Sequence, residues 1–322
     1  MPYYKIKHVT RYSYASTVID CTNQVMLYPL IDGNLEIKEH IIKISHHPVV
    51  EVFIDYFGNR TGVFSVIKPH TELLIESTAE VVTQPILLPQ DDAPAAEQWQ
   101  QIYQLHNQVP YMDFLAEKSF NSSDEVKAAL DEVVNYAETP MKNAEALSAY
   151  VYNNFSYQKG VTSVETPTDE VWQLKAGVCQ DFAHILLVFL RMYKIPARYV
   201  SGYICPQEKE MRGEGATHAW AEAHIPGYGW LGLDPTNNCI VNDRHVRLAV
   251  GRNFSDCTPV KGTYKGSGEH ILEVSVEIQN GSVKKKDQKQ GAPVFNYHSK
   301  NPGEPINTYR HYLEIQQKQQ QQ

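Results

Sequence analysis

The chain has 322 residues, of which 42% are hydrophobic and 20% are charged, an ordinary composition for a soluble globular protein. This length is too great for one small core and favours two domains with a tail. The formal net charge of −8 argues against a general nucleic-acid-binding protein, because binding to phosphates needs a basic surface.

The start of the chain, Met1 to Lys5, lacks the long apolar region of a signal peptide. No run of about 18 apolar residues predicts a transmembrane helix. The number of cysteines is odd, and no pair has the close spacing of a zinc site. We therefore expect a cytoplasmic protein without a metal, a cofactor or a membrane partner.

Residues 3–83 predict an antiparallel β domain. Apolar and polar residues alternate at 73–82, and shorter runs of the same kind follow the rest of the segment. Gly58-Asn59 indicates a turn between two of these runs, since both residues tolerate positive φ. Prolines 85, 89 and 94 then interrupt the pattern, so we place the first domain at 1–85.

Helices are expected at the start of a second domain, 86–260. Ser122-Ser123-Asp124-Glu125 offers a capping box for one helix. Thr139-Pro140 opens another, because proline at the first helical position loses no needed hydrogen bond. Thr166 to Asp169 caps a short third helix that ends near Lys175.

A further helix begins near Cys179. Its wide apolar stripe runs from Phe182 to Leu190, and it must stop before Pro196 because the residue preceding a proline disfavours helical geometry. Strands follow at 198–203 and 272–278, with a hairpin of 218–225 and 230–234 between them. We expect 261–280 to be a closing strand segment, and 281–322 to be a polar, glutamine-rich tail that is disordered or loosely docked.

Cys179, His218 and Asp234 predict a nucleophilic triad. A thiol at a helix N-terminus gains from the partial positive charge there, and an imidazolium from His218 favours the thiolate. Asp234 would hold the imidazole tautomer and stabilise its charge. The backbone N–H of Cys179 is a candidate oxyanion donor. Tyr157 is a candidate for a second donor, Gln180 for a residue that fixes the nucleophile loop, and Trp220 for a wall of the site.

Each of these residues also has a plainer interpretation. A lone cysteine before an apolar helix is usually a small buried hydrophobic residue, and an aspartate before proline is usually a turn residue. The joint occurrence of the three settings favours the triad. His184 and His224 are competing histidines; on a helix, His184 points away from Cys179, whereas His224 lies far along its strand. Asp181 has a structural interpretation, in which its carboxylate accepts hydrogen bonds from N–H groups at the helix terminus.

Strand parity makes the pairing of His218 with Asp234 testable. A four-residue loop at 226–229 would put the two side chains on opposite faces of the hairpin. A loop at 225–229 pairs residue 224 with 230 and makes His218 a diagonal same-face neighbour of Asp234, with about 7–8 Å between the backbones. We therefore predict an odd-length connection or a bulge.

At these residues the chain resembles the transglutaminase-like superfamily. The similar segments of the core are GVCQDFAH (177–184), IPARYVSGY (195–203), HAW (218–220) and GWLGLDPTN (229–237). HVTRYSY (8–14) and DYFGN (55–59) resemble the N-terminal β domain of its bacterial branch. The resemblance spans about residues 1–280.

The resemblance implies a papain-like α+β fold with nucleophile Cys179, base His218 and orienting Asp234. It also implies cleavage or transfer at amide bonds of peptides or proteins. The triad itself predicts acyl transfer through a thioester, and we favour hydrolysis over transfer to an amine. Two alternatives stay open: a non-catalytic binding or scaffold protein, and a protein whose N-terminal domain is the main partner-binding element.

Overall fold

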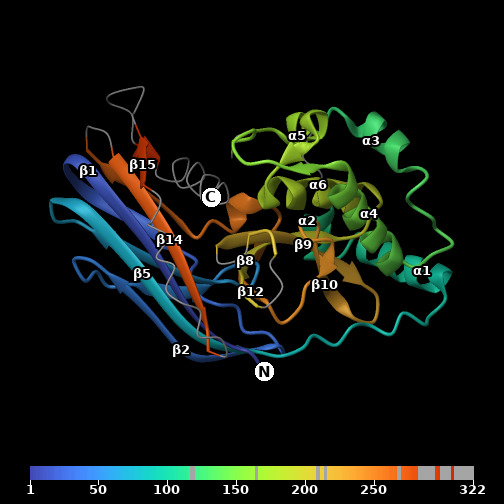
Figure 1. The fold of residues 1–322 in the computed structure, drawn as a ribbon, viewed down its shortest axis with the longest axis horizontal. Helices are drawn as coiled ribbons and strands as arrows, with labels where there is room; N and C mark the ends of the chain where they lie inside the picture. The colour runs from blue at the N-terminus through green and yellow to red at the C-terminus, as the bar shows by residue number, and fades with distance from the viewer. Residues whose placement is uncertain are drawn as a thin grey trace.

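The computed structural model is a two-part α+β structure in which a large antiparallel sheet stands beside a helix-covered core (Figure 1). It describes residues 1–116, 120–163, 166–207, 211–213, 216–266 and 270–281, together with the backbones of 294–297 and 306–307. In the described residues no helix is both long enough and apolar enough to cross a membrane. Most of the predicted tail, 281–322, lies outside the described residues.

The N-terminal part is organised around one long strand. Its strands are β1 (Tyr3–Val25), β2 (Leu35–Ile44), β3 (Glu51–Ile54), β4 (Arg60–Val66) and β5 (His70–Thr83). Burial alternates along β1 with the two-residue period of a half-buried strand. The first half of β1 pairs with β5 and the second half with β4. The predicted turn at Gly58-Asn59 is confirmed, and Gly58 takes a φ of +88°.

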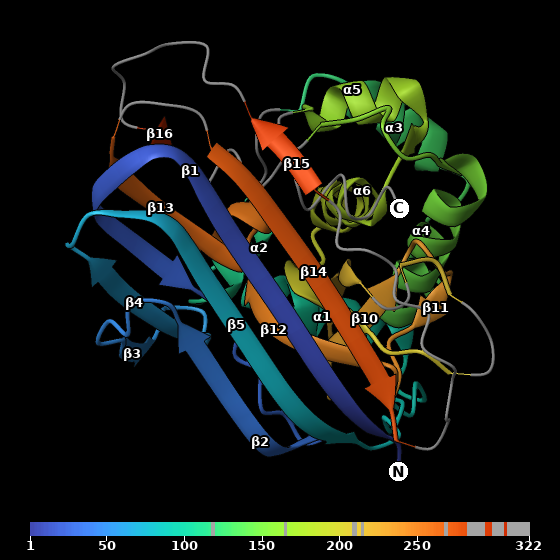
Figure 2. The same cartoon turned by 60° about the vertical axis from the view of Figure 1, so that its left-hand side comes forward.

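Residues from the far end of the chain complete this sheet. Strands β13 (Val260–Lys265) and β14 (His270–Asn280) pair with the second and first halves of β1, respectively. Figure 2 shows β5, β1 and β14 side by side along their length. Two short strands, β15 (Val294–Tyr297) and β16 (Ile306–Asn307), extend the edges. The segment predicted to close the chain therefore belongs to the N-terminal sheet.

Six helices of the described residues lie in or near the core. They are α1 (Ala95–Leu105), α2 (Tyr111–Leu115), α3 (Ser123–Leu130), α4 (Pro140–Asn154), α5 (Thr168–Leu174) and α6 (Cys179–Met192), with a 3-10 turn at η1 (Phe254–Asp256). The predicted start of α4 is confirmed, because the Thr139 hydroxyl accepts from the Lys142 N–H. The end of α6 before Pro196 is also as predicted.

The capping prediction for α3 was wrong. Ser122 precedes the helix but its side chain makes no capping hydrogen bond. Instead the Asp169 carboxylate, in the first turn of α5, accepts from both the N–H and the hydroxyl of Ser122, at 2.8 and 3.0 Å. A charged acceptor makes stronger hydrogen bonds than a neutral hydroxyl, so the distant carboxylate replaces the local cap. Asp169 is thereby drawn away from a capping role at α5, which has no side-chain cap.

The core sheet runs in the order β11 (Cys239–Ile240), β10 (Gly229–Asp234), β9 (Thr217–Ile225), β8 (Ala197–Ile204) and β12 (His245–Gly251). Two-residue strands β6 (Ser156–Tyr157) and β7 (Ala176–Gly177) form a small parallel pair before α6. Alternate residues of β9, Ala219, Ala221 and Ala223, join the core cluster that contains α6. His218 and Trp220 have the opposite parity and lie on the other face of the strand.

A buried asparagine joins the two parts of the molecule. Among the described strands, β12 ends the core sheet, and one of its edges has no neighbouring strand. The fully buried Asn59 side chain accepts from the Val250 N–H and donates to the Val250 carbonyl, both at 2.8 Å. Its amide also donates to Asp55. The predicted turn residue therefore satisfies an otherwise unpaired edge of the core sheet.

Replacing Asn59 with alanine is expected to weaken the fold. The substitution leaves the Val250 N–H and carbonyl buried without partners, which costs about 2–4 kcal/mol in the free energy of unfolding. Urea denaturation of Asn59→Ala and wild type measures this difference. Asn121→Ala, at an exposed position, is the matched control, and an equal effect of the two substitutions would show that the bridge is not important for stability.

Candidate active site

The β9–β10 hairpin sets the geometry of the imidazole–carboxylate pair. Ile225 pairs with Gly229, so only residues 226–228 connect the strands. This connection is shorter than the predicted loop but has the predicted odd length, and the parity prediction is confirmed. His218 and Asp234 share a face, and the distance from His218 Nε2 to Asp234 Oδ2 is 3.0 Å.

Asp234 is a buried carboxylate that accepts hydrogen bonds from several neighbouring groups. Its Oδ1 accepts from the backbone N–H groups of Thr236 and Asn237, at 2.9 and 3.3 Å. Its Oδ2 accepts from the Asn237 side-chain amide at 2.7 Å, in addition to His218. Burial alone would raise the pKa of Asp234, but His218 and the hydrogen bonds hold it well below its usual range. The residue is therefore a fixed negative charge in the interior.

Cys179 is the first residue of α6 and is fully buried. The Asp181 carboxylate accepts from the Val178 N–H at 2.8 Å and from the Thr162 hydroxyl at 2.7 Å, so Asp181 has the helix-end role that the sequence indicated. A Cβ at Gly177 would lie 2.5 Å from this carboxylate, which explains the glycine there. Burial raises the pKa of Asp181 to about 6 in spite of its hydrogen bonds.

His218 lies next to Cys179 as well as Asp234. Burial alone would lower the pKa of the His218 imidazole, but the charges of Asp234 and Cys179 raise it to about 10. At neutral pH the ring therefore carries its second proton. An imidazolium beside a cysteine sulfur favours the thiolate, which is the nucleophilic form. The structure thus brings together all three predicted triad residues.

A short segment, Met211–Gly213, covers the site. Gly213 has a φ of +80°, and a Cβ there would lie 2.6 Å from His218 Nδ1. The Arg212 guanidinium lies 5.7 Å from the centre of the Tyr157 ring. The backbone N–H of Arg212 donates to Asn237 Oδ1 at 2.8 Å, and its carbonyl accepts from the Asn237 side chain at 3.1 Å. Asn237 therefore ties the cover to Asp234.

The other predicted site residues also lie in this region. The Tyr157 ring stands edge-to-face on Phe182, with centroids 6.1 Å apart, and burial together with the Cys179 charge raises its pKa. Trp220 lies nearly parallel to the His218 ring at 6.3 Å. Gln180 is buried, and its Oε1 has no hydrogen-bond partner among the described groups. Trp220 thus walls the imidazole. The oxyanion role of Tyr157 and the role of Gln180 in fixing the nucleophile loop stay predictions.

The competing histidines have other partners. His184 Nε2 accepts from the Phe254 N–H at 3.3 Å, so this ring faces η1. His224 lies beside Trp230 with centroids 5.3 Å apart. Burial lowers the pKa of His224 to about 4, and the ring is neutral at pH 7.

His245 is a site residue that sequence reasoning missed. Its Nε2 lies 3.3 Å from Asp234 Oδ2, and its ring stands edge-to-face on Trp220 at 5.2 Å. Burial lowers the pKa of His245 despite the neighbouring Asp234, so the ring is neutral and donates from Nε2. No motif marks this histidine. It enters the site because β12 pairs with β8, a pairing that the sequence pattern did not reveal.

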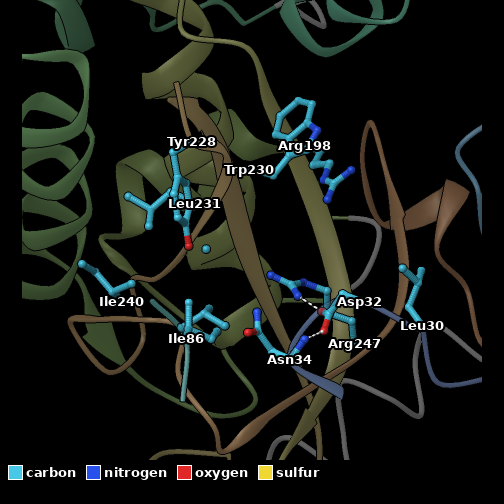
Figure 3. Close-up of a pocket in the computed structure, with 12 residues that line it drawn as sticks. Leu30, Asp32, Asn34, Ile86, Arg198, Tyr228, Trp230, Leu231, Ile240 and Arg247 are labelled. Atoms are coloured by element: carbon cyan, nitrogen blue, oxygen red, sulfur yellow. Dashed lines mark hydrogen bonds and ion pairs between the residues drawn. The ribbon is translucent and has the colours of Figure 1, made fainter. Parts of the chain in front are cut away.

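A cavity of about 230 Å³ lies further along the same face of β10, between the core sheet and the N-terminal part (Figure 3). Trp230 and Gly232, which share the parity of Asp234, line it. Arg198 and Arg247 also line it, and both form ion pairs with the buried Glu222. Arg247 additionally pairs with Asp32, as Figure 3 shows. The arginine charges are thus balanced by carboxylates of the chain itself.

Asp234→Asn is expected to lower the pKa of His218. With the negative charge removed, burial is opposed only by Cys179, and the pKa falls from its wild-type value of about 10. An NMR titration of the His218 ring protons measures the change. Asp92→Asn, at an exposed position, is the control. A pKa that stays near 10 in Asp234→Asn would show that Asp234 is not the cause of the shift.

The His218–Asp234 pair also predicts how the free energy of unfolding depends on pH. Because the folded-state pKa of His218 lies above the ordinary value, the protonated ring stabilises the fold fully below about pH 6.5. This contribution is lost as the pH rises through about 10. The difference in the free energy of unfolding between wild type and Asp234→Asn is therefore expected to narrow from pH 7 to pH 10, as measured by urea denaturation. A difference that widens over this range would contradict the assignment.

Family models match two parts of the chain. The model of the bacterial transglutaminase-like N-terminal region covers residues 4–82, and that of the transglutaminase-like superfamily covers residues 127–235, which includes all three triad residues. In Pseudomonas aeruginosa, a protein-glutamine gamma-glutamyltransferase is 30% identical over 107 residues, which are 29% of this chain and 16% of that protein.

Longer similarities extend over both parts. An uncharacterized protein of Mycobacterium tuberculosis is 30% identical over 293 residues, covering 85% of this chain and 92% of that protein. A crystal structure from Cytophaga hutchinsonii, described as a candidate cysteine protease, has the same fold with a TM-score of 0.67 and 21% identity, covering 92% of this chain and 98% of that one. The chain belongs to the transglutaminase-like superfamily, with the N-terminal region of its bacterial members.

Proposed function

We propose that the protein is a cysteine-dependent enzyme that attacks amide bonds of peptides or proteins and forms a thioester. The observation that carries this proposal is the hydrogen bond of His218 to the buried Asp234, beside a thiol at the start of α6. A nucleophile, a base within its reach and a third group that orients the base are the signature of nucleophilic catalysis.

The reaction has two halves. The Cys179 sulfur attacks the carbonyl carbon, and His218 gives its proton to the nitrogen of the departing amine, so that the C–N bond breaks and a thioester remains. His218 then takes a proton from the acceptor, whose oxygen or nitrogen attacks the thioester. Water as acceptor yields a carboxylic acid, and a primary amine yields a new amide. In both cases Cys179 is regenerated.

The helix start supplies one group that stabilises the developing negative charge. Cys179 is the first residue of α6, so its backbone N–H has no acceptor within the helix. It is aimed with the helix dipole at the site, as an oxyanion donor must be. Tyr157, which adjoins Cys179, is the proposed second donor. Asp234 stabilises the imidazolium and fixes its orientation.

Water is the acceptor that we favour. Cys179 and His218 are buried, so a peptide needs a local opening of the structure to reach them. The fold shared with a candidate cysteine protease agrees with hydrolysis, and the local similarity to a glutamyltransferase keeps amine transfer as the alternative outcome.

Substitutions in the triad are expected to remove the activity. Cys179→Ala abolishes thioester formation, and His218→Ala and Asp234→Asn each lower kcat by roughly 10³–10⁴-fold. The assay is mass spectrometry of a peptide library incubated with enzyme, with and without a primary amine. Backbone cleavage indicates a peptidase, conversion of a side-chain amide to an acid indicates an amidase, and incorporation of the amine indicates a transglutaminase.

Cys21→Ser is the matched control. This cysteine lies in β1 of the N-terminal sheet and is not in the proposed reaction, so the variant should keep wild-type activity. Full activity in Cys179→Ala would overturn the proposed function and favour a non-catalytic role of the fold.

A further inference from the structure

A sulfur, a ring nitrogen and a carboxylate meet at Asp234. Cys239 of β11 is the direct partner of Asp234 across the antiparallel pair β10–β11, and directly opposed residues share a face of the sheet. His245 reaches the same carboxylate from β12. One ligand atom from each of Asp234, Cys239 and His245 lies within 4.8 Å of the other two.

We propose that Asp234, Cys239 and His245 form a binding site for Zn²⁺ or a similar thiophilic divalent cation, and that occupation of this site switches the enzyme off. One thiolate, one imidazole and one carboxylate form a mixed set of donors that suits Zn²⁺, and three protein ligands leave a fourth position for water. The binding rests on geometry alone, whereas the inhibition rests on the proposed function.

Asn242 can hold the His245 ring in one orientation both without and with a bound metal. Its backbone N–H donates to His245 Nδ1 at 3.2 Å, and its side-chain Oδ1 lies 3.2 Å from the same nitrogen. With the proton on Nε2, Nδ1 accepts from the backbone; with the metal on Nε2, Nδ1 carries the proton and donates to Oδ1. A ligating histidine usually has such an outer partner, which fixes its tautomer. The ring therefore needs no change of orientation to bind a metal.

The protons displaced by metal binding are accounted for without another reagent. Cys239 releases its thiol proton to solvent, and the His245 proton moves from Nε2 to Nδ1 through water. Asp234 is already ionised and loses no proton. Cys239 is partly exposed, whereas Asp234 and His245 are buried, so the cation enters from the Cys239 side.

The site is coupled to the triad through one oxygen. Asp234 Oδ2 accepts from His218 at 3.0 Å and from His245 at 3.3 Å. A cation bound at this oxygen competes with the N–H of His218 for the same lone pairs. The hydrogen bond that orients His218 is thereby weakened or lost.

The first test measures binding without activity. The reduced full-length protein is titrated with Co²⁺, whose bond to a thiolate produces an intense near-ultraviolet charge-transfer band. Wild type and Cys179→Ala are expected to show the band, and Cys239→Ser and His245→Gln to lose it or to need at least about tenfold more metal. Circular dichroism checks that each variant is folded. A band that survives in both ligand variants, or disappears in Cys179→Ala, overturns the site.

The second test measures inhibition by Zn²⁺ in the peptide assay. Wild type is expected to lose activity with added Zn²⁺ and recover it with a chelator, and Cys239→Ser to need at least about tenfold more Zn²⁺ for the same loss. Equal inhibition of the two proteins overturns the regulatory role. If wild type has no activity on any peptide, the proposed function fails, and the Co²⁺ titration still decides whether the metal site exists.

Discussion

The buried charge of Asp234 is the interaction on which the rest of the site depends. A carboxylate in the interior is costly unless hydrogen bonds and an opposite charge compensate it. Here the residues that follow β10 supply backbone and amide donors, and His218 supplies the charge. The resulting fixed anion keeps His218 protonated. Without it, burial would shift the imidazole toward its neutral form, opposed only by Cys179.

The N-terminal part of the molecule contributes to this site through β12. The outer edge of β12 is satisfied at Val250 by Asn59, and the opposite end of the same strand begins with His245 beside Asp234. The turn at Gly58-Asn59 thus helps to hold the strand that brings His245 to the site. The N-terminal sheet is in turn completed by β13 and β14. The two parts therefore depend on each other structurally.

Features that depend on local pattern were predictable from the sequence. The pairing of His218 with Asp234 followed from the parity of one hairpin, because successive strand residues alternate between faces. His245 and Cys239 were not predictable as its neighbours, since β12 pairs out of sequence order and β11 has only two residues. The cap of α3 failed for a related reason: the acceptor, Asp169, comes from a later helix. These contacts depend on the pairing of segments that are distant in the chain, and such pairing cannot be recognised in a single sequence.

The hydrogen bonds of Asp234 explain how one carboxylate can both orient His218 and bind the proposed metal ion. Its two oxygens offer about four lone-pair sites, yet five donor contacts converge on them. Three of these contacts fall on Oδ2, and the one from His245 is the longest, at 3.3 Å. A cation between Oδ2 and His245 therefore replaces the weakest of the three contacts. Without a metal, Asp234 Oδ2 accepts from both His245 and His218 and orients His218. When His245 and Cys239 bind a metal beside it, Oδ2 interacts more weakly with His218.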